Sequence, residues 1–337
     1  MKKKLSVLLA TLLMVGGLTA CNNTTSNEVQ TPPAAEQTTI KIAALKGPTS
    51  MGMAKMIHDQ KDLETKAYDI EVLNAVDEVI PKVATGEVDI AAVPSNVSSA
   101  LYNKTEGKIV TLAINTLGVL YVVENGDTVQ SVADLKGKTI YSSGKGATPE
   151  YALNYILKGN GIDPEKDVTI EYKSEHAECL AALTNDKNGI AVLPQPFVTV
   201  AQTKNDALRV ALDLTKEWNA VTELRSDIKN GTLITGVIVA QKEFVEQNPE
   251  LVKTFLEDYK NSIEFTNSNV DEAAAFIGEA DIVPEPVAKK AIPECNITYI
   301  DGAEMKELLS GYLNVLFEAN PKSIGGTLPG EEFYYAQ

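Results

Sequence analysis

Small polar residues and glycines follow the ends of several apolar segments, at the points where a strand is expected to give way to a helix. Hydroxyl groups, side-chain amides and backbone N–H groups at helix starts suit hydrogen bonding to a small polar or anionic molecule. Together with the one Trp, these residues form the set that we expect to bind a ligand: Gly47, Pro48, Thr49, Ser50, Met51, Ser95, Asn96, Asn115, Thr116, Ser143, Gly144, Lys145, Gly146, Thr148, Gln195 and Trp218.

The strongest candidate among these loops is the segment from Ser142 to Glu150. Its glycines, Gly144 and Gly146, would let the backbone approach a ligand closely. Thr148 and Pro149 mark a helix start, with Thr as the N-cap and Pro at the first helical position. Turn and N-cap preferences also explain each loop taken alone, so the argument for binding depends on such loops recurring after strands.

Gln195 stands between two prolines after an apolar segment. We expect this turn to hold the Gln195 amide toward the ligand, where it can both donate and accept a hydrogen bond. The alternative is a turn residue that faces water. Trp218 and three further aromatic residues, Tyr121, Tyr151 and Phe197, could stack on a ligand ring, although packing in the core or on the surface explains each of them alone.

Little in the sequence favours catalysis or a metal site. His58 and His176 are the only histidines, and Cys179 and Cys295 are the only cysteines beyond the N-terminal segment. His176 and Cys179 lie close in sequence, but no second Cys/His cluster completes a four-ligand site, so we expect a surface helix face there. We expect no catalytic residue, no metal and no cofactor, and two separate thiols rather than a disulfide.

The elements that position the loops alternate between strands and helices. Apolar segments predict strands at 40–45, 68–73, 89–93, 109–114, 139–142, 168–172, 189–193, 208–212 and 232–240. Helical periodicity predicts helices at 51–59, 76–84, 151–157, 249–266, 270–278, 284–291 and 303–318. Apolar strands between helices favour a parallel sheet covered on both faces. Because the pattern restarts near residue 134, the sequence predicts an α/β fold of two lobes, with the helical C-terminal region packed on the first.

The charge of the chain excludes some partners. The formal net charge is −16, which argues against nucleic acid and anionic lipid because both bind basic surfaces. An anionic small molecule remains compatible, since the local field of a site can oppose the net charge. Beyond the N-terminus, no segment approaches the length of a membrane span.

The N-terminus carries lysines at 2–4, an apolar run at 5–15 and small residues before Cys21. This is the pattern of a secretory signal peptide. Residues 18–21, Leu-Thr-Ala-Cys, resemble the lipobox of bacterial lipoproteins, in which the Cys is acylated and becomes the new N-terminus. The resemblance implies a signal peptide at 1–20, a lipid (palmitate) anchor on Cys21 and a flexible polar tether at 21–38. The alternatives are a plain signal peptide with an incidental Cys and a membrane helix, for which the apolar run is shorter than the roughly 20 residues needed.

Several further segments resemble one class of transport protein. They are 42–48 (Ile-Ala-Ala-Leu-Lys-Gly-Pro), 86–91 (Gly-Glu-Val-Asp-Ile-Ala), 132–140 (Val-Ala-Asp-Leu-Lys-Gly-Lys-Thr-Ile), 193–197 (Leu-Pro-Gln-Pro-Phe) and the helix start at 248–252. Together they are similar to solute-binding lipoproteins of ABC importers, in the subfamily that includes the nitrate-, sulfonate-, taurine- and pyrimidine (thiamine-precursor)-binding proteins. The likeness covers nearly all of residues 39–337, and its parts occur in the family's order.

This resemblance implies a periplasmic-binding-protein-like fold, with lobe 1 at 39–118 plus 234–337 and lobe 2 at 119–233, joined by crossing segments near 117–123 and 230–236. The ligand would lie between lobes that close on it. The closed protein, a monomer anchored on the outer face of the bacterial cytoplasmic membrane, would then dock on an ABC permease. Related proteins often have Glu where Gln195 stands, so the class of ligand does not carry over. The Cys-rich motif of pyrimidine-synthesising relatives is also missing, which leaves their activity without support.

Two other functions remain open from the sequence. A sensory or adhesion lipoprotein would use the same fold without transport, and a permease and ATPase encoded alongside would separate transport from sensing. An exported enzyme would need a placed nucleophile, base or metal, and a carboxylate pair could still do acid–base work.

Overall fold

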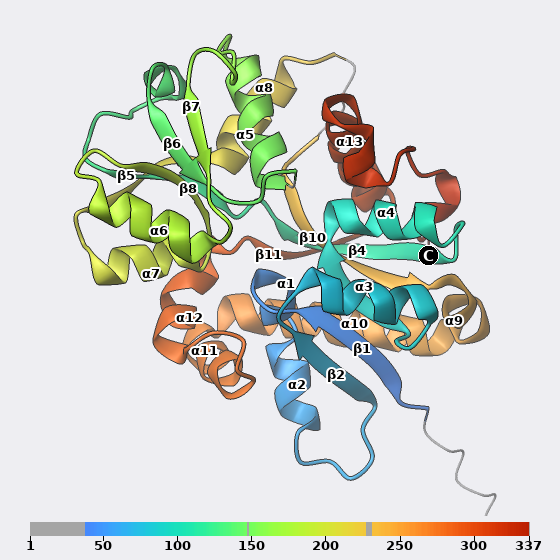
Figure 1. Ribbon diagram of the computed structural model, residues 1–337. Helices are drawn as coiled ribbons and strands as arrows, with labels where there is room; N and C mark the ends of the chain where they lie inside the picture. Colours follow the sequence, from blue (N-terminus) through green and yellow to red (C-terminus); the bar gives the residue numbers. More distant parts are fainter. Residues whose placement is uncertain (1–37, 147, 227–230, 337) are drawn as a thin grey trace, which may run out of the picture. The chain divides into compact units, whose positions relative to one another are not determined.

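The computed structural model describes residues 38–146, 148–226 and 231–336, which form two α/β lobes (Figure 1). The predicted signal peptide and Cys21 lie outside the described residues. The strands are β1 (Ile40–Leu45), β2 (Tyr68–Leu73), β3 (Ile90–Pro94), β4 (Ile109–Leu117), β5 (Leu120–Asn125), β6 (Thr139–Ser142), β7 (Thr169–Tyr172), β8 (Ile190–Pro194), β9 (Leu208–Asp213), β10 (Ile234–Gln241) and β11 (Ile297–Asp301).

The helices of lobe 1 precede or follow those of lobe 2 in the chain. The α-helices are α1 (Pro48–Met51), α2 (Ala54–Gln60), α3 (Val76–Thr85), α4 (Ser95–Lys104), α5 (Thr148–Gly159), α6 (His176–Asn185), α7 (Phe197–Lys204), α8 (Leu214–Glu223), α9 (Lys242–Gln247), α10 (Pro249–Ser268), α11 (Val270–Glu279), α12 (Glu285–Ala291) and α13 (Gly302–Ala319). The short 3-10 turns are η1 (Val132–Leu135), η2 (Ile292–Glu294), η3 (Pro321–Ile324) and η4 (Glu331–Phe333).

The two sheets share one arrangement of strands. Lobe 1 has the order β11-β4-β10-β3-β1-β2, and lobe 2 has the order β7-β6-β8-β5-β9. In each, three parallel strands (β2-β1-β3 and β7-β6-β8) are followed by one antiparallel strand, β10 or β5. That antiparallel strand enters each lobe from the other lobe, β5 after β4 and β10 after lobe 2. The chain therefore crosses between the lobes twice, between β4 and β5 and again before β10.

Helices cover both faces of both sheets, as the apolar strands require. In lobe 1, α3, α4 and α13 pack on one face, while α2, α10, α11 and α12 pack on the other. In lobe 2, α5 and α8 cover one face, and α6 and α7 cover the other. The predicted packing of the C-terminal helices on lobe 1 is confirmed. One cluster of buried apolar side chains is continuous from lobe 1 into lobe 2 through α13, α5 and α8.

Local sequence signals explain several element ends. The Glu78 carboxylate in the first turn of α3 accepts hydrogen bonds from the backbone N–H groups of Asn74 and Ala75, which leaves fewer unpaired donors at that helix start. Gly86 ends α3 with φ 72°, in the left-handed region that favours glycine. No helix in the described residues is both long and apolar enough to cross a membrane.

The structure corrects four expectations about elements. Neither sheet is wholly parallel, because β10, β4, β11, β5 and β9 pair antiparallel. The helix predicted at 51–59 is two helices, α1 and α2, separated at Gly52 and Met53. Strand β5 begins within the segment near 117–123 that we expected only to cross between lobes. Strand β11 was not predicted, since the segment before α13 carries no run of buried apolar residues.

Candidate functional site: the junction of the two lobes

The loops predicted to bind a ligand lie on the strand edges where the lobes meet. At the first crossing Leu120 pairs with Pro194, the last residue of β8. At the second crossing Gly236 pairs with Pro94, the last residue of β3. The carboxyl ends of the parallel strands in each lobe therefore lie next to the crossings. Helices α1, α4, α5 and α7 begin at these ends, which is where open α/β sheets bind ligands.

Within lobe 1 the predicted residues Thr49, Asn115 and Thr116 contact one another. The Asn115 amide donates to the Thr49 carbonyl (3.3 Å), and the Thr116 hydroxyl donates to Asn115 Oδ1 (3.0 Å). Gly236 makes this packing possible, because a Cβ there would lie 2.4 Å from both Asn115 Oδ1 and the Thr49 methyl group. The Tyr259 hydroxyl on α10 is buried, and it has no hydrogen-bond partner that meets normal geometry among the described residues. Burial raises its pKa, and the neighbouring Asn115 side chain opposes that shift.

Ser95 and Thr148, predicted on opposite lobes, meet at Tyr312 of α13. The Thr148 and Tyr312 hydroxyls lie 3.4 Å apart. Burial raises the pKa of Tyr312, and hydrogen bonding by the Thr148 and Ser95 side chains opposes the shift. Ser95 Oγ also donates to the Ile234 carbonyl at the second crossing (2.6 Å). A tyrosine from the C-terminal helix thus joins the two strand edges.

Trp218 is fully buried beside the same tyrosine. Its ring centroid lies 5.6 Å from that of Tyr312 and 4.3 Å from that of Tyr155 on α5. Its Nε1 has no hydrogen-bond partner among the described residues. Trp218 therefore marks the junction of the lobes, and its ring would contact a ligand only if these aromatic rings separate.

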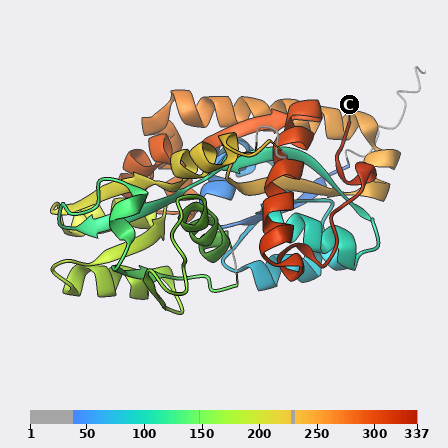
Figure 2. The ribbon, with the colours of Figure 1, turned by 90° about the horizontal axis from the view of Figure 1, so that it is seen from above.

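Two polar contacts extend this junction along α13, which lies beside α5 in both views (Figures 1 and 2). Asn320, just after α13, donates to the Tyr151 hydroxyl on α5 (2.9 Å). Arg225, after α8, forms a two-point ion pair with Glu318 of α13 at 2.9 and 3.0 Å. Tyr151, expected to stack on a ligand or pack in the core, is buried in the core, and its hydroxyl is part of this contact between lobes.

The loop before α5 is held at both ends. Ser143 Oγ lies 2.5 Å from His176 Nδ1 at the start of α6, and the Gly146 N–H donates to the Glu150 carboxylate (2.5 Å). Gly144 and Gly146 have φ 70° and 78°, so both take the left-handed conformation that glycine permits. The expected surface position of His176 is wrong, because its imidazole is half-buried against Ser143 and the Phe197 ring.

Gln195 lines a cavity between the lobes of about 530 Å³. Its Oε1 accepts from the backbone N–H (3.3 Å) and the hydroxyl (2.9 Å) of Thr199 in the first turn of α7. Tyr121 also lines the cavity, and Lys290 and Glu294 close it from lobe 1. The lining therefore combines two lysines, two carboxylates and two amides: Lys216, Lys290, Asp213, Glu294, Gln195 and Gln202.

Both arginines are already engaged in ion pairs. Arg209 and Arg225 are the only arginines in the sequence, and both pair with glutamates. Neither lies among the residues predicted to bind a ligand. An anion at the junction would be held by hydroxyls, amides, backbone N–H groups and lysines rather than by a guanidinium.

Some predicted residues lie apart from this junction or have structural contacts of their own. Met51 is fully buried in the lobe 1 core. Ser50 Oγ donates to the Gly47 carbonyl (3.1 Å). Asn96 Nδ2 donates to the Ser323 carbonyl (3.2 Å), on the side of α4 that contacts η3. A ligand contact by these residues, and by Pro48, stays a prediction.

No pattern in the sequence pointed to Tyr312 or Tyr259. Both come from C-terminal helices, where an inward tyrosine looks like any other core residue. His176 had a weak signal, because it begins a helix shortly after β7, in the same kind of position as the predicted ligand-binding loops. Within the described residues, no group of three or more His, Cys, Asp or Glu side chains could hold a metal ion. Cys179 and Cys295 are both free and buried.

A family model described as NMT1/THI5 like matches residues 69–273, which is more than half of the chain. The chain belongs to the NMT1/THI5-like family. The matched segment runs from β2 into α11 and so includes both crossings and all strands of lobe 2. The search of curated proteins gave no match.

Solved structures share the fold of this NMT1/THI5-like protein. An ABC transporter protein from Parabacteroides distasonis is 23% identical with a TM-score of 0.74, and the match covers 89% of this chain and 99% of that one. The periplasmic aliphatic sulphonate binding protein SsuA from Escherichia coli is 18% identical with a TM-score of 0.68, covering 88% and 92%. The alkanesulfonate-binding SsuA from Xanthomonas axonopodis pv. citri, bound to MOPS, is 16% identical with a TM-score of 0.60, covering 88% and 96%. The predicted periplasmic-binding-protein-like fold is confirmed.

Proposed function

We propose that this NMT1/THI5-like protein is an extracytoplasmic solute-binding protein, which captures a small polar or anionic organic molecule between its lobes and delivers it to an ABC importer. The observation that carries the proposal is the meeting of Ser95 and Thr148, from opposite lobes, at the Tyr312 hydroxyl. Polar groups from both lobes at one point are what a ligand needs in order to hold the lobes together.

Sulfonates are the first class of ligand to test. Two proteins with this fold bind sulfonates by name, and one of them is bound to MOPS. The junction supports an anion with neutral donors, since the backbone N–H groups of Gly144 and Lys145 make no hydrogen bond within the described part of the chain. Left-handed glycines on a loop let such N–H groups point toward one anion. At the Gln195 cavity, Lys216 and Lys290 are balanced by Asp213 and Glu294, so this cavity adds no net charge.

A thermal-shift screen of the chain from residue 22 onward tests the function. The panel should hold methanesulfonate, taurine, MOPS, nitrate, an aminopyrimidine and amino acids. A ligand that binds only the folded protein stabilises it by about 2.7 kcal/mol at a hundred times its dissociation constant. A shift with any member that Thr148→Ala weakens supports capture at the junction. A panel without any shift would contradict the proposed function.

The expected location of the protein depends on Cys21, which lies outside the described residues. We propose that the acylated Cys21 anchors the protein, with residues 22–38 as the tether, on the outer face of the cytoplasmic membrane. Cys21→Ala should release the protein from membranes or leave it uncleaved. Normal processing and membrane attachment of the variant would contradict the anchor without affecting the proposal on ligand capture.

A further inference from the structure

His176 and Ser143 form a close polar pair on the edge of lobe 2 that meets lobe 1. Ser143 Oγ lies 2.5 Å from His176 Nδ1, and the serine is only 3% exposed. The imidazole packs against the Phe197 ring, with centroids 5.1 Å apart. The Cys179 thiol, one turn along α6, is a further hydrogen-bonding neighbour of Ser143. The serine hydroxyl is therefore shared between two titratable groups.

Burial favours the neutral form of both neighbours of Ser143, Cys179 and His176. Burial raises the pKa of the Cys179 thiol, so at neutral pH it remains an S–H donor. Burial lowers the pKa of His176, so its imidazole is neutral. The positive end of the α6 dipole acts in the same direction, because His176 is the first residue of that helix. A neutral imidazole with a proton on Nε2 accepts at Nδ1, and the Ser143 hydroxyl is the donor within reach.

We propose that His176 couples capture of an anion to uptake of a proton, by reversing its hydrogen bond to Ser143. In the free protein the Ser143 O–H donates to Nδ1. When Nδ1 takes a proton from solvent, the new N–H donates to Ser143 Oγ, and the Ser143 O–H is released to donate to a ligand held by the backbone N–H groups of Gly144 and Lys145. His176 is thus a positioning residue that acts through Ser143. The proposal deepens the proposed function, on which it rests.

A bound anion would supply the negative counter-charge that a protonated His176 lacks in the free protein. The low polarity around the ring limits its protonation in the free protein, since burial lowers the pKa of His176. A negative charge bound at the loop would favour the charged ring by Coulomb attraction. By linkage, the protonated ring must then favour the anion to the same extent.

Other titratable groups on the packed elements are few and mostly engaged. On α6 and its N-cap, Glu178 accepts from the Ser174 N–H, while Glu175 is exposed. After β7, Lys173 pairs with Glu171. The remaining titratable groups on β5, β6, β7, α7 and residues 143–146 are Tyr121, Glu124, Tyr141, Tyr172, Lys204 and Lys145.

The direction of the hydrogen bond can be read by nitrogen NMR of the ligand-free protein. The chain has two histidines, so His58→Gln leaves His176 as the sole imidazole signal. At pH 7.5 we expect Nδ1 of His176 to be unprotonated and Nε2 to carry the proton. Saturating methanesulfonate, which stays anionic at every pH used, should raise the His176 pKa. A proton on Nδ1 of the neutral ring would overturn the reversal.

Calorimetric titration with methanesulfonate at pH 5 and pH 8, at constant ionic strength, tests the coupling. The wild-type protein should bind about tenfold more tightly at pH 5, since one hydrogen bond to a charged group is gained. His176→Asn keeps an amide near the Nδ1 position without titrating, so its affinity should not change with pH. Ser143→Ala should bind more weakly and also lose most of the pH dependence. His58→Gln is the matched control and should behave as wild type.

The outcomes separate this proposal from the proposed function. Equal pH dependence in wild type, His176→Asn and Ser143→Ala would assign it to another group and overturn the coupling. If methanesulfonate fails to bind, the same titrations are made with the first anion that the screen finds. If the screen finds only neutral ligands, the coupling is overturned while solute capture stands.

Discussion

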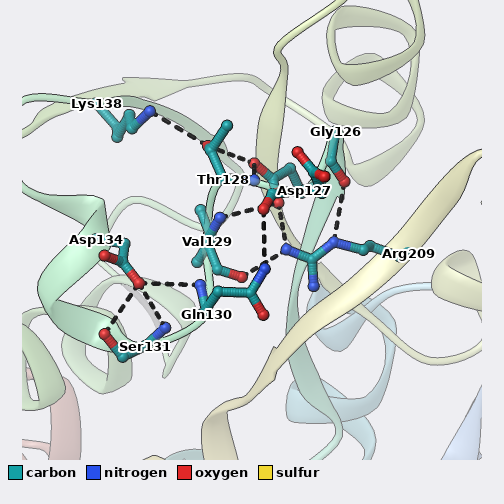
Figure 3. Close-up of polar contacts among 10 residues, drawn as sticks. Gly126, Asp127, Thr128, Val129, Gln130, Ser131, Asp134, Lys138 and Arg209 are labelled. Atoms are coloured by element: carbon teal, nitrogen blue, oxygen red, sulfur yellow. Dashed lines mark hydrogen bonds and ion pairs between the residues drawn. The ribbon is translucent and has the colours of Figure 1, made fainter.

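Arg209 and Glu124 sit directly opposite each other on the neighbouring strands β9 and β5 and form an ion pair in lobe 2. Arg209 Nη2 lies 2.7 Å from Glu124 Oε2 and also donates to the Val129 carbonyl (2.6 Å). The Glu124 carboxylate is 1% exposed and further accepts from the backbone N–H groups of Thr128 and Val129 and from the Thr128 hydroxyl. Figure 3 shows how these contacts tie the loop 126–131 to the two strands.

Removing the arginine should destabilise the protein. Arg209→Met would leave the Glu124 carboxylate buried without its counter-charge, at a cost of about 2–3 kcal/mol because the arginine is partly exposed. Urea denaturation at pH 7 measures this. Lys166→Met is the matched control, since Lys166 pairs with Asp163 at the surface, and it should cost much less. Equal losses in the two variants would contradict a special role for the buried pair.

The contribution of Glu124 should vanish in acid. Burial raises the pKa of this carboxyl, but the hydrogen bonds from Thr128 and Val129 and the charge of Arg209 together lower it below its ordinary value. A lowered pKa in the folded state means that the pair stabilises the fold at neutral pH and that this stability is lost as the pH falls through the folded-state pKa. The stability difference between wild type and Glu124→Gln should therefore be largest near pH 7 and shrink below pH 4.

Tyr312→Phe should weaken ligand binding with little effect on the fold. The substitution removes only the hydroxyl that Thr148 and Ser95 reach, and the ring keeps its packing against Trp218. We expect about a fivefold loss of affinity, the value of one hydrogen bond. Tyr68→Phe is the control, because its hydroxyl bonds Asp258 on α10 (2.6 Å), away from the junction. Unchanged affinity in Tyr312→Phe would remove this hydroxyl from the site.

The change in ligand affinity caused by Gln195→Glu should show whether the ligand is negatively charged. The glutamate would keep the acceptor that Thr199 uses, lose the amide donor and add a negative charge to the cavity. For an anionic ligand we expect a loss of about 1–3 kcal/mol in binding, and for an amine-bearing ligand no loss. Titration of both proteins over a range of salt measures this. Equal affinities throughout would place Gln195 outside the site.

Gly236→Ala, on strand β10, should displace the neighbouring site residues Thr49 and Asn115. The added Cβ would lie 2.4 Å from Asn115 Oδ1 and the Thr49 methyl, so both side chains must move. Overpacking of this kind costs about 1–3 kcal/mol, and we expect affinity to fall as well. Gly330→Ala is the control, because nothing lies closer than 3.8 Å to a Cβ there. Wild-type affinity in Gly236→Ala would show that Thr49 and Asn115 do not contact the ligand.

The intrinsic fluorescence of Trp218 should report movement of the lobes, so that no added label is needed. It is the one tryptophan of the chain and contacts Tyr312 across the junction. Ligand binding that changes this contact should shift or quench its emission. Trp218→Phe should abolish the signal while binding, followed by calorimetry, persists. Emission that stays constant at saturating ligand would show that the α13 contact is fixed during capture.

The sequence was most informative about strands and about the loops after them. The largely apolar run at 40–45 coincides with β1, because a strand covered on both faces is apolar at most of its positions. The strand predicted at 139–142 coincides with β6, although it holds both polar and apolar residues. From strand order alone, Ser95 and Thr148 could be assigned to ligand-facing edges. Their meeting at Tyr312 could not, because it depends on how α13 packs against lobe 2.

Antiparallel pairing was missed for a related reason. Strands β5 and β10 are as apolar as their parallel neighbours, so composition carries no information about direction. Direction is decided by the two crossings, which are long-range features. The half-buried position of His176 also depends on such packing, since only the arrangement of α6 beside the loop after β6 brings it to Ser143.

The arrangement of the sheets sets an order in which the two lobes can be completed during synthesis. All five strands of lobe 2 lie between Leu120 and Asp213, so the sheet of that lobe is complete once this stretch has been made. The sheet of lobe 1 has β10 between β3 and β4, and β10 follows lobe 2 in the chain. The strands β1 to β4, at residues 40–117, must therefore wait until the chain has passed residue 241, with the edges of β3 and β4 that β10 will pair still open. Unpaired strand edges invite association with other chains, so a chaperone that shields β3 and β4 would act before the second crossing exists.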